Sequence, residues 1–167
     1  AMKRNRKIGL LLVDLEGQYK LTIEHAKACI NEYEKYLDVF WVSLPIHLRN
    51  AVSVYEPFWK CWDKNKKEDW IRQPPEFAIT DNKYFPFFKD GMEFEEFVPE
   101  FGEWYAQGKK TCCCVGIRSD ESLNRYRTIS SKVKESYKNK CYTTKITENV
   151  YNFYPIYDWT TEDIWVY

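Results

Sequence analysis

Two arginines and two acids form the chemically most informative stretch of this sequence. An apolar run over 115–117 leads into Arg118, the acids Asp120 and Glu121 follow, and Arg125 comes about two helical turns after the first arginine. A guanidinium presents several N–H donors in one plane, which suits it to a phosphate or sulfate group. Open parallel sheets bind ligands at the carboxyl ends of their strands, where this stretch is expected to lie. The pattern predicts one wall of a site for an anionic ligand, with a nucleotide as our first hypothesis.

The acids of this stretch leave a structural alternative open. Arg118 could form an ion pair with Asp120 or Glu121 and have no further role. The same acids could instead hold the arginines in position for a ligand. Arg125 is the better second candidate, because residues about two helical turns apart project in a similar direction.

A second set of polar residues follows the first predicted strand. Asp14 and Glu16 come where that strand gives way to a loop, and Thr22 lies in the helix that follows. A carboxylate there can accept hydrogen bonds from ribose hydroxyls or an adenine amino group. The alternatives are a helix-capping Asp14, a solvated Glu16 and a Thr22 that is plain helix surface.

A third candidate, Asp158, follows another predicted strand end. Trp159 as a core residue and Thr160 as a helix cap explain that stretch locally. Asp158 could equally orient a basic residue from the Arg118 region.

The first elements needed to position these residues form a strand–helix–strand unit. The apolar run over 8–13 fits a strand buried on both faces. Apolar residues at helical spacing predict a helix from about Gln18 to Tyr36, and 39–42 is the next strand. Short joints between them indicate a parallel crossover.

Residues 45–108 break this alternation. They hold several prolines and much of the aromatic content, with one clear helix from about Glu93 to Tyr105. We interpret them as an insertion with its own aromatic cluster.

The alternation of elements resumes after this insertion. A strand over 111–117, a helix from the expected cap Ser119 to about Ile129, strands over 141–146 and 150–156, and a helix capped by Thr160 follow. The fold class is α/β with a doubly wound parallel sheet, in a single domain over 1–167.

Composition excludes several classes of protein. The 25 basic and 25 acidic residues balance, so we expect no direct nucleic-acid binding. Aromatic residues make up 18% of the chain, which excludes disorder. No stretch is long and apolar enough for a membrane and no signal peptide is visible, so we expect a cytoplasmic protein without a membrane partner.

The cysteines and histidines give no metal motif. We interpret the six cysteines, including the triplet 112–114 in a strand expected to be buried, as reduced core thiols. His25 and His47 show no paired histidine or Cys–His neighbour, and we expect no metal site.

Taken together, these motifs resemble the phosphoadenosine phosphosulfate (PAPS) reductase family. The resemblance rests on 116–125, on 155–165, and on 13–16 before the helix that bears Thr22. Segments 55–59, 94–104 and 122–127 look like the bacterial branch whose members are described as co-activators of prophage gene expression. The resemblance implies a Rossmann-like, adenine nucleotide alpha hydrolase-like fold and an adenine nucleotide ligand of the PAPS, APS or ATP type. It also implies that Asp14 lies near the adenosine and that Arg118 and Arg125 lie near the anionic groups.

Two family motifs are absent from this sequence. The family opens with a strand and a Ser-Gly-Gly-Lys-Asp-Ser phosphate loop, and true reductases carry a Glu-Cys-Gly motif with the catalytic cysteine. We therefore expect an incomplete core that does not reduce sulfonucleotides by itself, and name no catalytic residue. An uncovered sheet edge would favour a homo-oligomer. The alternative function is a regulatory module that binds a protein partner through its aromatic insertion.

Overall fold

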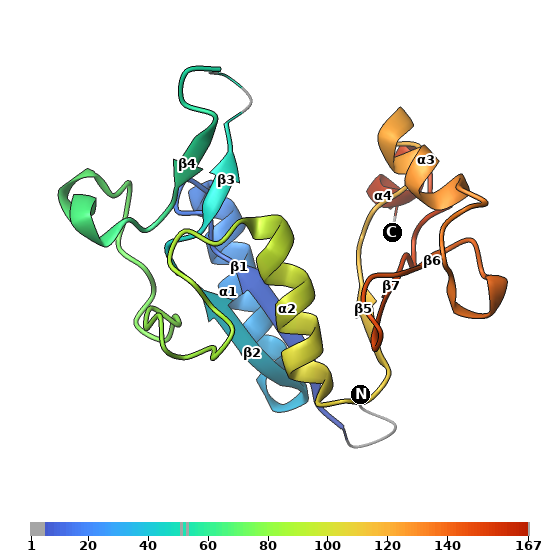
Figure 1. Ribbon diagram of the computed structural model, residues 1–167, viewed down its shortest axis with the longest axis horizontal. Coiled ribbons are helices and arrows are strands. Elements are labelled where there is room, and N and C mark those ends of the chain that lie inside the picture. Colours follow the sequence, from blue (N-terminus) through green and yellow to red (C-terminus); the bar gives the residue numbers. More distant parts are fainter. Residues whose placement is uncertain (1–5, 51, 53, 167) are drawn as a thin grey trace. The chain divides into compact units, whose positions relative to one another are not determined.

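The computed structural model describes residues 6–50, 52 and 54–166 (Figure 1). The chain divides into two compact units, the first ending at Phe97 and the second beginning at Val98. Helix α2 (Phe94–Ala106) runs across this boundary and matches the predicted helix within one residue at either end. Both units combine helices with parallel strands, as an α/β chain should.

The predicted strand–helix–strand unit is confirmed in the first unit. Strands β1 (Ile8–Val13) and β2 (Leu37–Val42) pair in parallel and in register, so both end at the same edge. Helix α1 (Lys20–Tyr33) connects them, followed by the 3-10 turn η2 (Glu34–Tyr36). The residues that directly follow the two strands are therefore brought together.

One apolar face of α1 forms a core against the two strands. Ile23 and Ile30 of the helix pack with Trp41 of β2, and all three are at least 92% buried. Partly buried apolar residues complete this cluster: Leu10, Leu12, Ala26, Val39 and Ala78. Removing this apolar surface from water stabilises the crossover at about 25 cal/mol per Å².

The aromatic insertion has its own local structure. Strands β3 (His47–Arg49) and β4 (Phe58–Lys60) form an antiparallel hairpin, and the 3-10 segment η3 (Lys64–Asp69) follows. The chain then returns to β2, where Ile79 N donates to Trp41 O at 2.7 Å. The predicted aromatic cluster is present and gathers on Phe97 of α2, at ring-centroid distances of 5.5 to 6.0 Å from Phe85, Phe87 and Phe88.

The second unit contains a three-stranded sheet in the order β5-β7-β6. Strands β5 (Thr111–Cys114) and β7 (Val150–Phe153) are parallel, and β6 (Thr143–Lys145) is antiparallel to β7. Helices α3 (Leu123–Ser130) and α4 (Thr161–Val166) and the 3-10 turn η4 (Tyr137–Asn139) complete it. Gly102 of α2 lies against β7, because a Cβ there would come within 3.1 Å of Val150.

The described strands form three separate sheets. One doubly wound sheet therefore remains a prediction, as does the single domain. Within the residues described, no helix is long and apolar enough to cross a membrane.

The expectation of buried core thiols is correct for Cys61 and wrong for most of the triplet. Cys61 is fully buried, whereas Cys112, Cys114 and Cys141 are exposed and Cys113 is half-buried. The physical reason is that successive side chains of a strand point to opposite faces, so Cys112 and Cys114 share one face of β5, which is exposed, and Cys113 points to the other.

Candidate functional site

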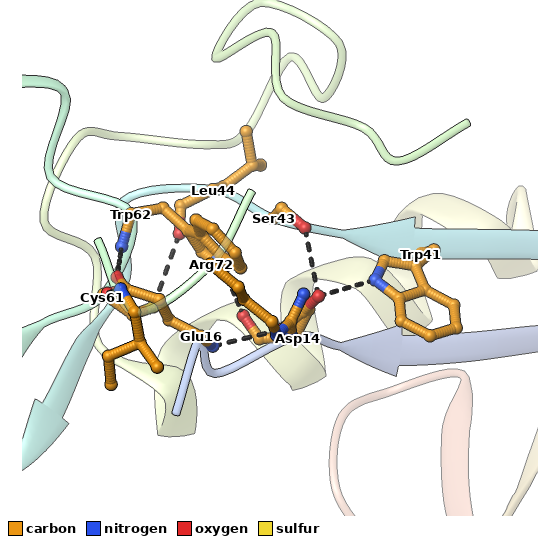
Figure 2. Close-up of polar contacts among 9 residues, drawn as sticks. Asp14, Glu16, Trp41, Ser43, Leu44, Cys61, Trp62 and Arg72 are labelled. Atoms are coloured by element: carbon orange, nitrogen blue, oxygen red, sulfur yellow. Dashed lines mark hydrogen bonds and ion pairs between the residues drawn. The ribbon is translucent and has the colours of Figure 1, made fainter. Parts of the chain in front are cut away.

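Asp14 is the centre of a buried polar group at the carboxyl ends of β1 and β2 (Figure 2). It directly follows β1, its side chain is fully buried, and its backbone N–H donates to Val42 O at 2.8 Å. Oδ2 accepts hydrogen bonds from Trp41 Nε1 at 2.7 Å and from Ser43 Oγ at 3.4 Å. The parallel register of the two strands places these donors beside the carboxylate.

The second carboxylate oxygen of Asp14 is also occupied. Oδ1 accepts from Glu16 N at 3.0 Å and forms an ion pair with the guanidinium Nη2 of Arg72. A carboxylate offers about four acceptor positions, and these contacts use all of them. Asp14 does not cap α1, whose N-cap residue is Tyr19.

Glu16 is buried, so the alternative of a solvated side chain is wrong. It is 5% exposed and adopts a left-handed backbone conformation with φ 64°. Its Oε2 accepts from Trp62 N at 2.7 Å and its Oε1 from Ile71 N at 3.1 Å. These two bonds hold residues 61–72, which we call the covering segment, against the loop after β1.

The covering segment supplies three side chains to this group. Trp62 Nε1 donates to Asp14 O at 2.6 Å, and the guanidinium of Arg72 lies 5.2 Å from the centre of the Trp62 ring. The Cys61 thiol approaches the carbonyl of Ile46 at 3.4 Å, and burial raises its pKa to about 11. Local sequence patterns missed Arg72, because nothing near it points to an acid so far away in the chain.

Thr22 lies apart from this polar group. It is exposed on α1, and none of the contacts described for Asp14 or Glu16 involves it. The surface alternative describes its position, and a ligand contact stays a prediction.

Arg118 is the centre of a second polar group, built within the second unit after β5. Its side chain is 12% exposed, and Nη1 donates to Trp159 O at 3.3 Å. Its Nη1 lies 3.8 Å from Asp120 Oδ2 and its Nε lies 3.6 Å from Glu121 Oε1. The ion pairs of the structural alternative are thus present.

Glu121 also contacts the second arginine. Its Oε2 lies 2.8 Å from Nε of Arg125, whose side chain is 48% exposed. One carboxylate therefore bridges Arg118 and Arg125, as expected if the acids hold the arginines in place. Binding of a ligand by either guanidinium remains a prediction.

The helix after Arg118 begins later than predicted. Ser122, not Ser119, is the N-cap, and its Oγ accepts from Arg125 N at 3.3 Å. The hydroxyl of Ser119 donates instead to Tyr157 O at 2.8 Å. The expected cap is wrong because Ser119 bonds to the neighbouring strand end, and Glu121 consequently lies in the turn before α3.

The stretch after β7 contains the predicted cap of α4. Thr160 Oγ1 accepts from Asp163 N at 3.3 Å, and Asp163 Oδ2 accepts from Thr160 N at 2.8 Å. The Thr160 backbone N–H and hydroxyl lower the pKa of Asp163, and the charge of Arg118 adds to this effect.

Asp158 is exposed, and its charge raises the pKa of Tyr157.

Among the residues that the structure describes, no group of three or more His, Cys, Asp or Glu side chains could hold a metal ion. His25 does have a thiol neighbour that sequence reading overlooked, because Cys29 Sγ lies 3.5 Å from its Nε2 one helical turn along.

Comparison with known proteins gives the family. The phosphoadenosine phosphosulfate reductase domain matches residues 1–167. The uncharacterized protein YbdN of Escherichia coli strain K12 is 39% identical over 170 aligned residues, which cover 100% of this chain and 41% of that protein. No solved structure matches. A match along the whole sequence, together with a relative at this identity, shows that the chain belongs to the phosphoadenosine phosphosulfate reductase family.

Proposed function

We propose that this chain is an adenine-nucleotide-binding domain of the sulfonucleotide type, with a ligand of the PAPS, APS or ATP kind. The observation that carries the proposal is the bridge from Glu121 to Arg118 and Arg125, in the stretch that joins the parallel strand β5 to α3. Family membership supports the same class of ligand. Asp120 and Asp158, which belong to the same unit, are proposed to help orient the arginines of this site.

The arginine pair is suited to an anion by its remaining donors. A guanidinium has five N–H donors, and the described contacts of Arg118 use only Nε and Nη1. Because Glu121 fixes both arginines, a phosphate or sulfate meets donors that are already oriented. Such charge-assisted bonds contribute about 1.5–3 kcal/mol each.

We infer that this chain does not reduce a sulfonucleotide by itself. Attack on the sulfonyl sulfur needs a nucleophilic thiol, and none of the six cysteines stands in a Glu-Cys-Gly motif. Burial raises the pKa of Cys61 to about 11, so that thiol is a poor source of thiolate.

Titration calorimetry tests the nucleotide proposal. APS, PAPS, ATP and AMP are titrated into the full chain and into Arg118→Ala. We expect Arg118→Ala to lower the affinity for the most tightly bound nucleotide by about 10- to 100-fold. Arg127→Ala is the control, since Arg127 is exposed on α3, the helix that also carries Arg125. Equal affinity of Arg118→Ala and the unmodified chain would remove Arg118 from the site.

A second candidate function is a non-catalytic regulatory module of the prophage co-activator type, acting through a protein partner. The loop of the β3–β4 hairpin favours it, because Val52, Val54 and Tyr55 are 88–96% exposed. In addition, β1 pairs only with β2 among the described strands, which leaves a sheet edge for another strand.

Light scattering tests this candidate with a second copy of the chain as the partner. We expect association at high concentration that Tyr55→Ser weakens. Leu21→Ser is the control, because Leu21 is 77% exposed on α1. A monomer at every concentration would contradict self-association.

A further inference from the structure

A histidine and a cysteine meet on the surface of α1, outside the two polar groups described above. His25 and Cys29 lie four residues apart in this helix, so their side chains are neighbours on one face, one turn apart. Nε2 of His25 lies 3.5 Å from Sγ of Cys29. The imidazole is exposed and the thiol is half-buried. The first unit thus presents a nitrogen donor and a sulfur donor side by side and open to solvent.

The helix holds this pair in a fixed arrangement. Ile23 and Ile30 are buried and pack another side of α1 against the two parallel strands. The pair lies outside that buried face, one donor on each of two successive turns. Donors carried by a packed helix are positioned more precisely than donors on a loop, so little freedom is lost when both bind the same ion.

The separation of the two donor atoms matches what a zinc ion requires. Zinc binds thiolate sulfur at about 2.3 Å and imidazole nitrogen at about 2.0–2.1 Å, with tetrahedral angles of about 109° between its ligands. These values put the sulfur and the nitrogen about 3.5 Å apart. The observed separation of Cys29 Sγ and His25 Nε2 is 3.5 Å. An ion can therefore bind both atoms without a change in the helix backbone.

The types of the two donors select the kind of ion. Thiolate and imidazole are the ligands that proteins use for zinc, whereas magnesium and calcium take oxygen ligands. As a hydrogen bond, the same contact contributes little, because a thiol is a weak donor and water competes for exposed groups. The pair is thus better suited to a thiophilic divalent cation than to holding the helix together.

We propose that His25 and Cys29 form a two-donor site for Zn²⁺ on α1. Binding forms a Zn–S and a Zn–N bond, releases the thiol proton of Cys29 to solvent and displaces part of the hydration shell of the ion. Nε2 of His25 then carries no proton, and Nδ1 carries the ring hydrogen. Water fills the other positions, since no third His, Cys, Asp or Glu side chain joins the pair among the described residues.

This site is independent of the proposed nucleotide function. It also revises the expectation of no metal site, which rested on neighbours in the sequence and overlooked a partner one helical turn away.

Site-resolved alkylation tests the thiol half of the site. N-ethylmaleimide is added to the full chain near neutral pH with and without zinc chloride, and mass spectrometry of the peptides gives a labelling rate for each cysteine. We expect about 100 µM free Zn²⁺ to slow the labelling of Cys29 about 10-fold, the protection that a dissociation constant of about 10 µM gives. Cys141, exposed in the second unit, is the internal control and should keep its rate.

Variants of α1 show whether the imidazole is needed. His25→Gln removes the ring nitrogen and keeps a polar side chain at an exposed helix position, so it should abolish the zinc protection of Cys29. Glu24→Gln is the matched control, because Glu24 is exposed and directly precedes His25, and it should preserve the protection. Circular dichroism verifies that both variants keep the helix.

Nuclear magnetic resonance tests the imidazole half separately. The chain has two histidines, and His25→Gln assigns their ring signals. Zn²⁺ should shift the ring signals of His25 and leave those of His47 unchanged, and Cys29→Ser should remove the shift. A merely structural contact between the two side chains would give no response to zinc in either ring.

Two results would overturn the zinc site. One is protection of Cys29 below about 2-fold at about 100 µM Zn²⁺. The other is equal protection in His25→Gln, which would mean that the thiol binds zinc without the imidazole. Neither result bears on the nucleotide proposal, because the calorimetric titrations concern Arg118 in the second unit.

Discussion

The indole nitrogen of Trp41 donates a 2.7 Å hydrogen bond to Oδ2 of Asp14, although 27 residues separate them. Trp41 is 1% exposed and Asp14 is fully buried. The parallel pairing of Leu12 with Trp41 puts the ring of one strand beside the acid that ends the other. The carboxylate is therefore part of the packed interior of the first unit, at the edge where α/β sheets bind ligands.

Trp41→Phe should lower the free energy of unfolding by about 1–3 kcal/mol, because it leaves a buried carboxylate oxygen without its shortest neutral donor. Urea unfolding followed by circular dichroism measures this. Trp59→Phe is the control, since Trp59 is 39% exposed on β4. Equal losses in both variants would mean that ring size, and not the hydrogen bond, determines the effect.

Arg72→Gln should destabilise the chain by about 3–5 kcal/mol, because it leaves the buried charge of Asp14 without its counter-ion. Combining it with Asp14→Asn removes that charge as well. The double variant should therefore lose clearly less than the sum of the two single losses, as measured by urea unfolding. Additive losses would show that the ion pair has no energetic role.

Ser122→Asp should keep the stability of α3, because a carboxylate also accepts the N-cap hydrogen bond. Ser119→Asp should destabilise the chain by about 1–3 kcal/mol, because the carboxylate that it introduces cannot donate to Tyr157 O as the serine hydroxyl does. Thermal unfolding of the two variants compares these serines directly. The opposite ranking would restore Ser119 as the cap.

Acid should weaken the second unit through Glu103 of α2. Hydrogen bonds from Thr147 and from the side chain and backbone of Asn149 lower its pKa below the ordinary value of 4.5. Its folded pKa is the depressed one, so its contribution is complete above pH 4.5 and is lost as the pH falls through the folded pKa.

Urea unfolding from about pH 7 to about pH 3 measures this loss. Glu103→Gln should flatten the acid side of the stability profile. Glu100→Gln, one turn earlier on α2, is the control. An unchanged acid slope in Glu103→Gln would contradict the prediction.

The thiols should differ sharply in reactivity. Maleimide near neutral pH should label the exposed Cys141 rapidly, and Cys61 only after unfolding, because Cys61 is buried and its pKa is raised to about 11. Mass spectrometry of the labelled peptides gives both rates. Comparable labelling of the two cysteines in the folded chain would show that the covering segment opens readily.

Elements with a local pattern could be predicted from the sequence. The apolar run of β1, the helical spacing of Ile23 and Ile30, and the cap at Thr160 each depend on neighbours within a few residues, and the structure contains all three. Element boundaries were less predictable. Ser119 and Ser122 are equally good caps by residue type, and only the bond from Ser119 to Tyr157 decides between them.

The sequence by itself determined the α/β class, the parallel crossover and the family, because hydrophobic periodicity and motifs depend on residues that lie close together in the sequence. Only the tertiary structure decided that Asp14 is saturated and that its counter-ion is Arg72, 58 residues away. The physical reason is that the partner of a buried charge depends on which loop folds over it. No pattern within a short stretch of sequence records that choice.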